Sequence, residues 1–192
     1  NPPYLPLFWF PLIKPIFAGI VLFFLGIDLY AQNGLTLSTL TVNDGLSQGM
    51  IFDILQSRDG FIWIATKDGL NRYDGSRFEV FSPDPFNPYA IGGSEVQALF
   101  EDSRGWLWIS LPDGVDVYEP GSGYFFHVKF NKRSIPSQYI AETADGAIWL
   151  SNLDEVIKIL PKKEQLQQAV QQKSANIEVA YKPIAMKNAG GW

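Results

Sequence analysis

The chain has 192 residues, of which 46% are hydrophobic, 15% aromatic and 18% charged, and its formal net charge is −5. This composition excludes a disordered chain, and the high aromatic content favours strands over helices. The acidic balance lacks a basic stripe, which argues against a nucleic-acid partner. The sequence contains no cysteine, which excludes disulfides, thiolate chemistry and cysteine-based zinc sites.

An apolar run from Ile16 to Ile27 follows Lys14 near the beginning of the chain. A helix of this length covers about 18 Å, which is short for a bilayer core and typical of a signal peptide. Ala31 offers a small residue for cleavage after the run. We therefore expect residues 1–31 to be a signal peptide, with a retained membrane anchor as the alternative. The rest of the chain is expected on the periplasmic side of the bacterial inner membrane, and only this segment contacts the membrane.

Three segments of the chain repeat one pattern. Their tryptophans stand at positions 63, 108 and 149, with spacings of 45 and 41 residues, and glycines at 60, 105 and 146 keep the same spacings. Each segment contains an apolar run, a polar turn that ends in glycine, a dense apolar strand, a second turn and a short strand. A fourth strand follows in the first two segments. Four short antiparallel strands in about 40 residues form the unit of a propeller blade.

The positions of the expected strands follow from this pattern. The first strands are predicted at 50–55, 96–100 and 139–141, the second at 61–66, 106–110 and 147–151, and the fourth at 78–81 and 124–128. The third strands end at Tyr73, Tyr118 and Ile159. Asp59-Gly60 predicts a type I′ turn, in which both central residues have positive φ. The three tryptophans are expected to fill the space between adjacent blades.

The sequence thus predicts an all-β chain, a partial β-propeller of about three four-stranded blades and the start of a fourth, over residues 32–192. The blades are expected at about 45–82, 94–130 and 135–183, with a helical insertion at 161–176. Residues 35–42 are predicted to be a lone strand that fastens the last blade of a closed ring. Gly190-Gly191-Trp192 matches the start of a further unit, so we expect the chain to stop before the propeller closes.

The motifs Asp-Gly-Leu-Ser-Gln (44–48), Asp-Gly-Phe-Ile-Trp-Ile-Ala-Thr (59–66) and Asp-Gly-Leu-Asn-Arg-Tyr-Asp-Gly (68–75) resemble the two-component regulator propeller repeat. The resemblance covers about residues 36–160 and is strongest in the first unit. In the third unit Glu155 stands in place of the usual glycine and Ile159 in place of the usual tyrosine, so the turn there is expected to differ.

The resemblance implies the sensory region of a membrane receptor, a histidine kinase or hybrid two-component system of Bacteroidetes-type bacteria. It also implies that two seven-bladed propellers, an immunoglobulin-like domain, a transmembrane helix and a kinase make up the longer parent. The partners that it implies are an oligosaccharide ligand, the remaining blades of the same parent chain and a second copy of the parent in a homodimer.

The chemistry-bearing residues predict no catalytic or metal site, no cofactor and no identifiable ligand-binding residue. The only histidine, His127, is expected to be a partly exposed strand residue, and no nucleophile motif accompanies it. Six aspartates suggest calcium or glycosidase chemistry as an alternative, but most stand beside glycine, where aspartate caps turns. These are Asp44, Asp59, Asp68, Asp74, Asp113 and Asp145.

Three functions compete at this point. The first is a ligand-sensing, carbohydrate-responsive propeller of an exported signalling receptor, without catalysis in this portion. The second is part of a propeller-fold polysaccharide lyase or hydrolase, which is expected to carry clustered histidine, tyrosine, arginine or paired acids on equivalent loops. The third is a stand-alone scaffold that binds other envelope proteins.

Overall fold

The computed structural model describes residues 37–152, 155–179 and 181–184. The chain divides into the units Asn1–Thr39 and Leu40–Trp192, and all elements named below belong to the second unit. The expected signal peptide, the first two residues of the expected lone strand and the expected start of a fourth blade lie outside the described residues.

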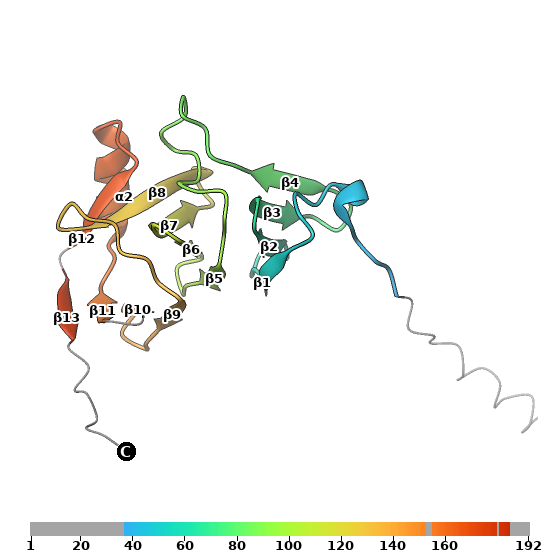
Figure 1. The fold of residues 1–192 in the computed structure, drawn as a ribbon. Coiled ribbons are helices and arrows are strands. Elements are labelled where there is room, and N and C mark those ends of the chain that lie inside the picture. The colour runs from blue at the N-terminus through green and yellow to red at the C-terminus, as the bar shows by residue number, and fades with distance from the viewer. Residues whose placement is uncertain (1–36, 153–154, 180, 185–192) are drawn as a thin grey trace, which may run out of the picture. The chain divides into compact units, whose positions relative to one another are not determined.

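Three sheets follow one another along the chain, and the strands β1 to β11 pair antiparallel within them (Figure 1). The first sheet contains β1 (Ile51–Gln56), β2 (Ile62–Thr66), β3 (Gly69–Tyr73) and β4 (Phe78–Phe81) in sequential order. The second contains β5 (Ala98–Glu101), β6 (Leu107–Leu111), β7 (Gly114–Glu119) and β8 (Tyr124–Phe130). The third contains β9 (Tyr139–Glu142), β10 (Ile148–Ser151), β11 (Val156–Ile159) and β13 (Lys182–Ile184). The predicted all-β partial propeller with three blades is confirmed.

The turn between the first and second strands is built in the same way in all three blades. In the first blade the N–H of Ser57 donates to the carbonyl of Phe61, and the N–H of Gly60 donates to the carbonyl of Ser57. Gly60 has a φ of 93°, and Asp59 is not among the residues with positive φ. The predicted type I′ turn is therefore wrong. The three-residue loop needs a left-handed conformation only at its last position, which explains why glycine is repeated there.

Each repeated tryptophan is hydrogen-bonded to the turn that precedes it. The indole N–H donates to a side-chain oxygen six residues earlier, over 3.0–3.2 Å, in the pairs Trp63–Ser57, Trp108–Asp102 and Trp149–Thr143. A buried donor without an acceptor costs about 1–3 kcal/mol, so the turn residue and the tryptophan depend on each other. The side chain that shapes the turn is also the acceptor that lets the indole be buried.

Two apolar clusters lie between successive blades, as predicted for the tryptophans of the first two. Trp63 packs on Tyr118 of the second blade, with ring centroids 5.2 Å apart, and both belong to one cluster. Trp108 is fully buried in a second cluster that includes Ile148 and Leu150 of the third blade. Trp149 is only half-buried, and Lys158 lies 5.3 Å from the centre of its ring.

Polar contacts cross the two seams at equivalent repeat positions. The N–H of Arg58 donates to the carboxylate of Glu101 over 2.9 Å, and the N–H of Ser103 donates to Glu142 over 2.7 Å. Asp53 adds a third contact by accepting from the N–H of Leu99 over 2.8 Å. The repeat therefore fixes the relative placement of the blades through carboxylates as well as through apolar packing.

The insertion predicted at 161–176 contains the helix α2 (Lys163–Gln171), whose buried residues are Leu166 and Ala169. It is followed by β12 (Asn176–Val179), which pairs in parallel with β8 of the second blade. The second blade thus has five strands, and the prediction of a four-stranded second blade is wrong. Ile177 and Val179 face the core, and β12 supplies partners for the backbone of an otherwise unpaired edge strand. The described part of the chain holds no helix with the length and apolar character that a membrane span requires.

The described part of the predicted lone strand, residues 37–42, is not a strand. Residues 37–41 have no regular structure, and Val42–Asp44 form a 3-10 turn capped by Thr41. The carboxylate of Asp44 accepts from the N–H of Thr41 over 2.7 Å. A strand needs a neighbouring strand to pair its backbone groups, and the described residues offer none to this segment.

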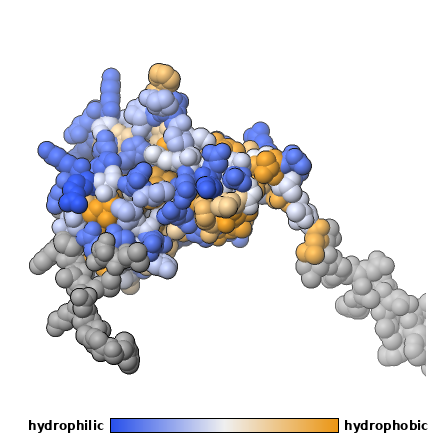
Figure 2. Space-filling model, viewed as in Figure 1, coloured by the Kyte–Doolittle hydropathy of each residue, from blue (hydrophilic) through white to orange (hydrophobic). Residues whose placement is uncertain are grey.

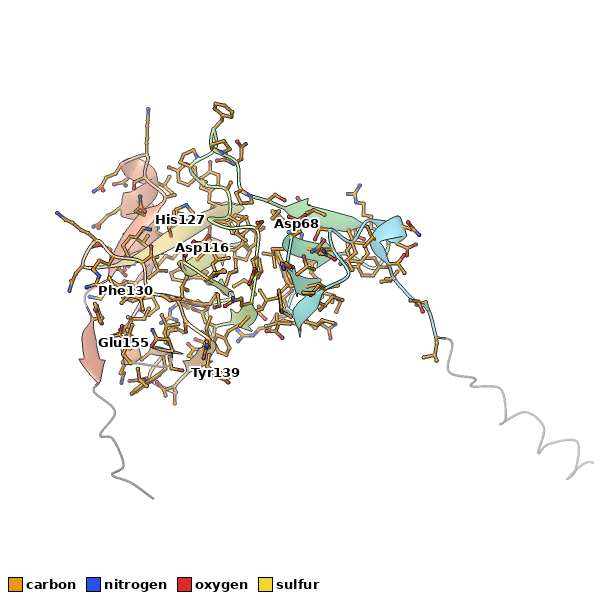
Figure 3. All side chains as sticks on the ribbon, viewed as in Figure 1. Asp68, Asp116, His127, Phe130, Tyr139 and Glu155 are labelled. Atoms are coloured by element: carbon orange, nitrogen blue, oxygen red, sulfur yellow. The ribbon has the colours of Figure 1, made fainter. Side chains whose placement is uncertain are left out.

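The turn between β10 and β11 differs from its counterpart in the first blade, as the replacement of glycine by Glu155 predicts. Gly69 has a φ of 119°, whereas Glu155 is not among the residues with positive φ. The side-chain oxygen of Asn152 accepts from the N–H of Glu155 over 2.9 Å instead. Figure 3 shows Glu155 at the edge of the third blade.

One face of the first blade is apolar and exposed. In β1 the side chains alternate, so that Leu55 packs into the seam with the second blade while Phe52 and Ile54 are 45% and 58% exposed. Val80 of β4 is also exposed (42%). Figure 2 shows hydrophobic atoms on the surface of this sheet. Sheets that are apolar on both faces are typical of blades that have a neighbour on each side.

The turn between β3 and β4 is capped by Asp74. One carboxylate oxygen accepts from the N–H groups of Ser76 and Arg77, over 2.8 and 2.9 Å. The hydrogen bonds from Arg77 and then from Ser76 lower the pKa of Asp74 to about 2.

We predict that Asp102→Ala lowers the free energy of unfolding by about 2–4 kcal/mol, because it leaves the indole N–H of Trp108 and the N–H of Trp106 without acceptors in the core. The midpoint of urea unfolding measures this effect. Asp113→Ala, in an exposed turn of the same blade, is the control. Equal midpoints for the two variants would contradict the role of Asp102.

We also predict that the carboxyl ¹³C resonance of Asp74 titrates with a midpoint near 2. Because the folded pKa is depressed, the contribution of this cap to stability is present above the unfolded value of about 3.9. It is lost as the pH falls through the folded value. A midpoint close to the unfolded value would show that the cap does not form.

Candidate functional site

The aspartates singled out from the sequence lie mostly in turns. Asp59 and Asp145 accept hydrogen bonds from Ser57 and Thr143, the turn residues of their own blades. The hydrogen bond from Thr143 and then the one from Lys158 hold the pKa of Asp145 well below its usual range. Asp68 and Asp113 lie in the turns between the second and third strands of their blades, and Figure 3 shows Asp68. In the described ranges, no three or more histidine, aspartate or glutamate side chains gather closely enough to hold a metal ion.

His127 lies on β8, and 23% of its side chain is exposed, as predicted for a partly exposed strand residue. Its Nδ1 is 2.8 Å from Oδ1 of Asp116, which is the cross-strand partner of His127 on β7 (Figure 3). Asp116 is buried, and its Oδ2 accepts from the N–H of Gly92 over 2.7 Å. Together with Lys129 and Ser134, the pair lines a cavity of about 250 Å³.

The pair of Asp116 and His127 was not predicted from the sequence, although a signal existed. The two residues are 11 positions apart in the third and fourth strands of one blade, and a correct hairpin register makes them neighbours. The register depends on the length of the turn at 120–123, which the sequence pattern did not define.

The surroundings of His127 do not form a serine protease-like triad. The hydrogen bond to Asp116 raises the pKa of His127, while burial and the charge of Lys129 lower it. The hydroxyl of Ser134 accepts from the ammonium of Lys129 over 2.7 Å. A general base needs a free ring nitrogen within reach of its nucleophile. Here the ring is hydrogen-bonded to Asp116, and Ser134 is hydrogen-bonded to Lys129 and not to His127.

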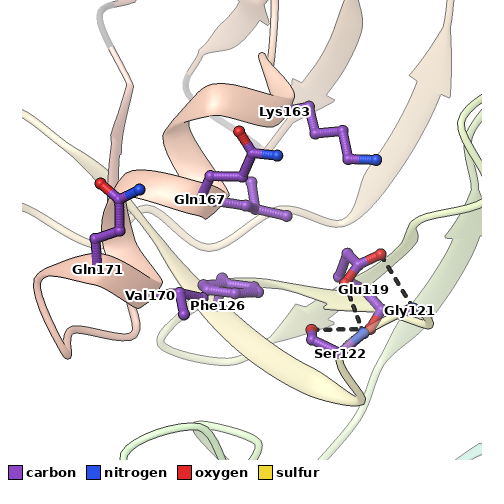
Figure 4. Close-up of a pocket in the computed structure, with 9 residues that line it drawn as sticks. Glu119, Gly121, Ser122, Phe126, Lys163, Gln167, Val170 and Gln171 are labelled. Atoms are coloured by element: carbon purple, nitrogen blue, oxygen red, sulfur yellow. Dashed lines mark hydrogen bonds between the residues drawn. The ribbon is translucent and has the colours of Figure 1, made fainter.

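A hollow lies between α2 and the turn that joins β7 to β8, and Figure 4 shows its walls. Its volume is about 660 Å³. We name it the α2 groove; it is lined by Glu119, Gly121, Ser122, Phe126, Lys163, Leu166, Gln167, Val170 and Gln171.

The two walls of the α2 groove differ in character. On the blade side, the carboxylate of Glu119 holds the turn by accepting from the N–H groups of Gly121 and Ser122, over 3.0 and 2.7 Å (Figure 4). On the helix side, the exposed side chains of Gln167 and Gln171 line the hollow together with the apolar Leu166 and Val170. The groove therefore combines a carboxylate held by the turn, exposed amides and apolar side chains, which is a lining suited to a polar small molecule.

Part of the first repeat matches a known protein family. The family described as "Two component regulator propeller" matches residues 45–68. Histidine kinase P4 from Formosa agariphila is 39% identical over 77 residues, which are 40% of this chain and 6% of that kinase. The chain thus spans only a small part of the length of this relative.

Two solved structures share the fold. The extracellular domain of the hybrid two component system BT3049 from B. thetaiotaomicron superimposes with a TM-score of 0.58 and 21% identity, over 64% of this chain and 18% of that chain. The extracellular domain of the hybrid two component system BT4673 from the same organism gives a TM-score of 0.53 and 20% identity, over 70% of this chain and 20% of that chain. The repeated turn, the tryptophan at its fixed distance from that turn, the blade fold and the sequence match agree with one another. Residues 45–68 thus match the two component regulator propeller family, and the chain shares its blade fold with the two extracellular domains.

Proposed function

We propose that this chain is an extracytoplasmic sensory portion of a two-component signalling receptor, whose kinase lies elsewhere in a longer protein. The observation that carries the proposal is the segment of 77 residues that is 39% identical to a histidine kinase. The likeness to extracellular domains of hybrid two component systems supports the extracytoplasmic location. On this proposal the chain itself senses and does not catalyse.

The apolar faces of the outer blades support a further part of the proposal. Phe52, Ile54 and Val80 of the first blade are exposed, and Trp149 of the third blade is half-buried. We propose that further blades of the same parent protein cover these faces, and that the parent is a homodimer anchored in the inner membrane. Burial of apolar area contributes about 25 cal/mol per Å², so covering these side chains would stabilise the ring.

We propose that the receptor responds to carbohydrate and that the α2 groove is where a short oligosaccharide binds this portion. Gln167, Gln171 and Ser122 can donate and accept hydrogen bonds, as recognition of sugar hydroxyls requires. Lys163 and Glu119 add one charge of each sign at the rim. The insertion that carries α2 interrupts the third blade, and loops that interrupt a rigid scaffold are common places for binding residues.

We predict that titration with defined tetrasaccharides of cellulose, xylan, laminarin and alginate shifts the backbone amide resonances that line the α2 groove for at least one of these sugars. Gln167→Ala combined with Gln171→Ala is expected to weaken that binding about tenfold or more, because two direct hydrogen bonds are lost. Gln168→Ala, on the opposite face of the same helix, is the matched control and keeps the affinity of the unchanged chain.

Two outcomes separate the parts of this proposal. Shifts that cluster in another part of the blades would keep the sensory function and overturn the groove as the site. No saturable shift with any of the four sugars would overturn carbohydrate binding by this portion of the receptor.

A further inference from the structure

The three blades pair the same positions across their strands, so corresponding faces can be compared. In every blade the last residue of the first strand lies opposite the residue just before the tryptophan; these pairs are Gln56–Ile62, Glu101–Leu107 and Glu142–Ile148. Side chains that lie opposite each other in an antiparallel pair are on the same face of the sheet. Gln56 therefore corresponds to Glu101 and Glu142, the two carboxylates that accept backbone N–H groups across the seams.

The donor of each seam contact is the turn residue directly after the side chain that accepts from the indole. Arg58 and Ser103 hold this place in the first and second blades. Ala144 holds it in the third blade and is exposed. Within residues 37–152, 155–179 and 181–184, neither the N–H of Ala144 nor the side chain of Gln56 has a hydrogen-bond partner. The first and third blades thus carry the two unpaired halves of one further seam contact.

The face of the first blade that carries this unpaired acceptor has residue types that the other blades bury in a seam. Ile54 is 58% exposed, whereas its counterpart Leu99 is 8% exposed and packs in the seam with the first blade. Tyr73 is half-buried, whereas its counterpart Tyr118 is buried and packs on Trp63. We name this surface the back face of the first blade; it comprises Ile54, Gln56, Ile62, Tyr73 and Val80.

The third blade presents the complementary half of a seam. Trp149 is half-buried, whereas its counterpart Trp63 is buried against the second blade. Lys158 lies opposite Trp149 and 5.3 Å from the centre of its ring, and Arg72 holds the same place beside Trp63 at 5.6 Å. Ala141, which lies opposite Trp149 on the other neighbouring strand, is exposed. We name this surface the front face of the third blade; it comprises Ala141, Ala144, Trp149 and Lys158.

We propose that the chain associates head to tail with a second copy of itself, whose front face of the third blade docks on the back face of the first blade. The N–H of Ala144 in one copy donates to the side-chain oxygen of Gln56 in the other. Tyr73 packs on Trp149, as the corresponding residues pack in the first seam. The second copy is the occupant because the new seam repeats, position by position, the two seams that the chain already contains. In a longer parent, further blades would supply the same groups, so this inference stands apart from the proposed sensory function.

A head-to-tail contact uses a different face on each copy, so two variants that block opposite faces can complement each other. Ile54→Lys places a charge on the back face, and Ala141→Lys places one on the front face. In sedimentation velocity the unchanged chain is expected to form larger assemblies as its concentration rises, whereas each variant alone stays monomeric. An equal mixture of the two variants is expected to form a dimer that grows no further, because one compatible pair of faces remains. Phe86→Lys, at an exposed position in the connection between the first two blades, is the control and associates like the unchanged chain.

A third variant is expected to strengthen the contact. Gln56→Glu gives the first blade the acceptor that the other two blades carry, and a charged acceptor forms a stronger hydrogen bond than a neutral one. The dissociation constant is expected to fall about fivefold to tenfold. Gln168→Glu on α2 makes the same change of charge away from both faces and keeps the dissociation constant of the unchanged chain. Exchange of the Ala144 N–H, followed by NMR, is expected to slow as the chain concentration rises.

Three results would overturn the head-to-tail contact, and each leaves the sensory function standing. The first is a chain that stays monomeric at every concentration. The second is association that Ile54→Lys abolishes and Ala141→Lys keeps, which would indicate that two first blades meet each other. The third is association that persists equally in both variants, which would place the contact outside these two faces.

Discussion

An indole N–H buried between two sheets needs an acceptor, and the repeat supplies it from the turn just before the tryptophan. In each blade the residue at the start of this turn has two roles. Its backbone closes the loop, and its side-chain oxygen accepts from the indole six residues later. The acceptor residue is serine in the first blade, aspartate in the second and threonine in the third, but the spacing and the length of the hydrogen bond are similar in all three. A blade therefore cannot place its tryptophan in the seam without also forming the turn, which couples local structure to the packing between blades.

The burial of the repeated tryptophan differs between the second and third blades. Trp108 is fully buried and bound to the buried carboxylate of Asp102, whereas Trp149 is half-buried and bound to the exposed Thr143. The second blade also carries the parallel strand β12, which α2 covers, and this strand arrives from the segment that follows the third blade. The insertion thus joins the second and third blades through backbone pairing, and it creates the groove that we assign to a ligand. Structural support and the proposed recognition site come from the same segment.

Most of the fold was predictable because the repeat is local. Each strand from β1 to β11 lies within two or three residues of its expected place, since the apolar runs and the turn glycines define both ends of a strand. What depended on distant partners was missed. β12 pairs with a strand about 50 residues earlier, and nothing in Asn176–Val179 indicates that partner. Residues 37–42 have a strand-like sequence, but in the described part of the chain no neighbouring strand pairs with them.

The candidate site was less predictable than the fold for the same reason. His127 was correctly placed on an outer strand. Its surroundings, however, are formed by Asp116 on the adjacent strand and by Gly92, whose N–H donates to Asp116 and which lies in a connection with no repeat pattern. Likewise, the α2 groove is formed by a turn and a helix more than 40 residues apart. Single residues in regular elements follow from periodicity, whereas sites formed across connections require the three-dimensional structure.

The central claim is that each tryptophan is held by its own turn and that the next blade covers Trp63 and Trp108. Hydrogen exchange of the indole N–H groups, followed by NMR on chain labelled with ¹⁵N at tryptophan, tests it directly. The account predicts the slowest exchange for Trp108, which is buried and bound to Asp102, slower exchange for Trp63 than for Trp149, and the fastest of the three for Trp149. Equal exchange rates for Trp108 and Trp149 would contradict it.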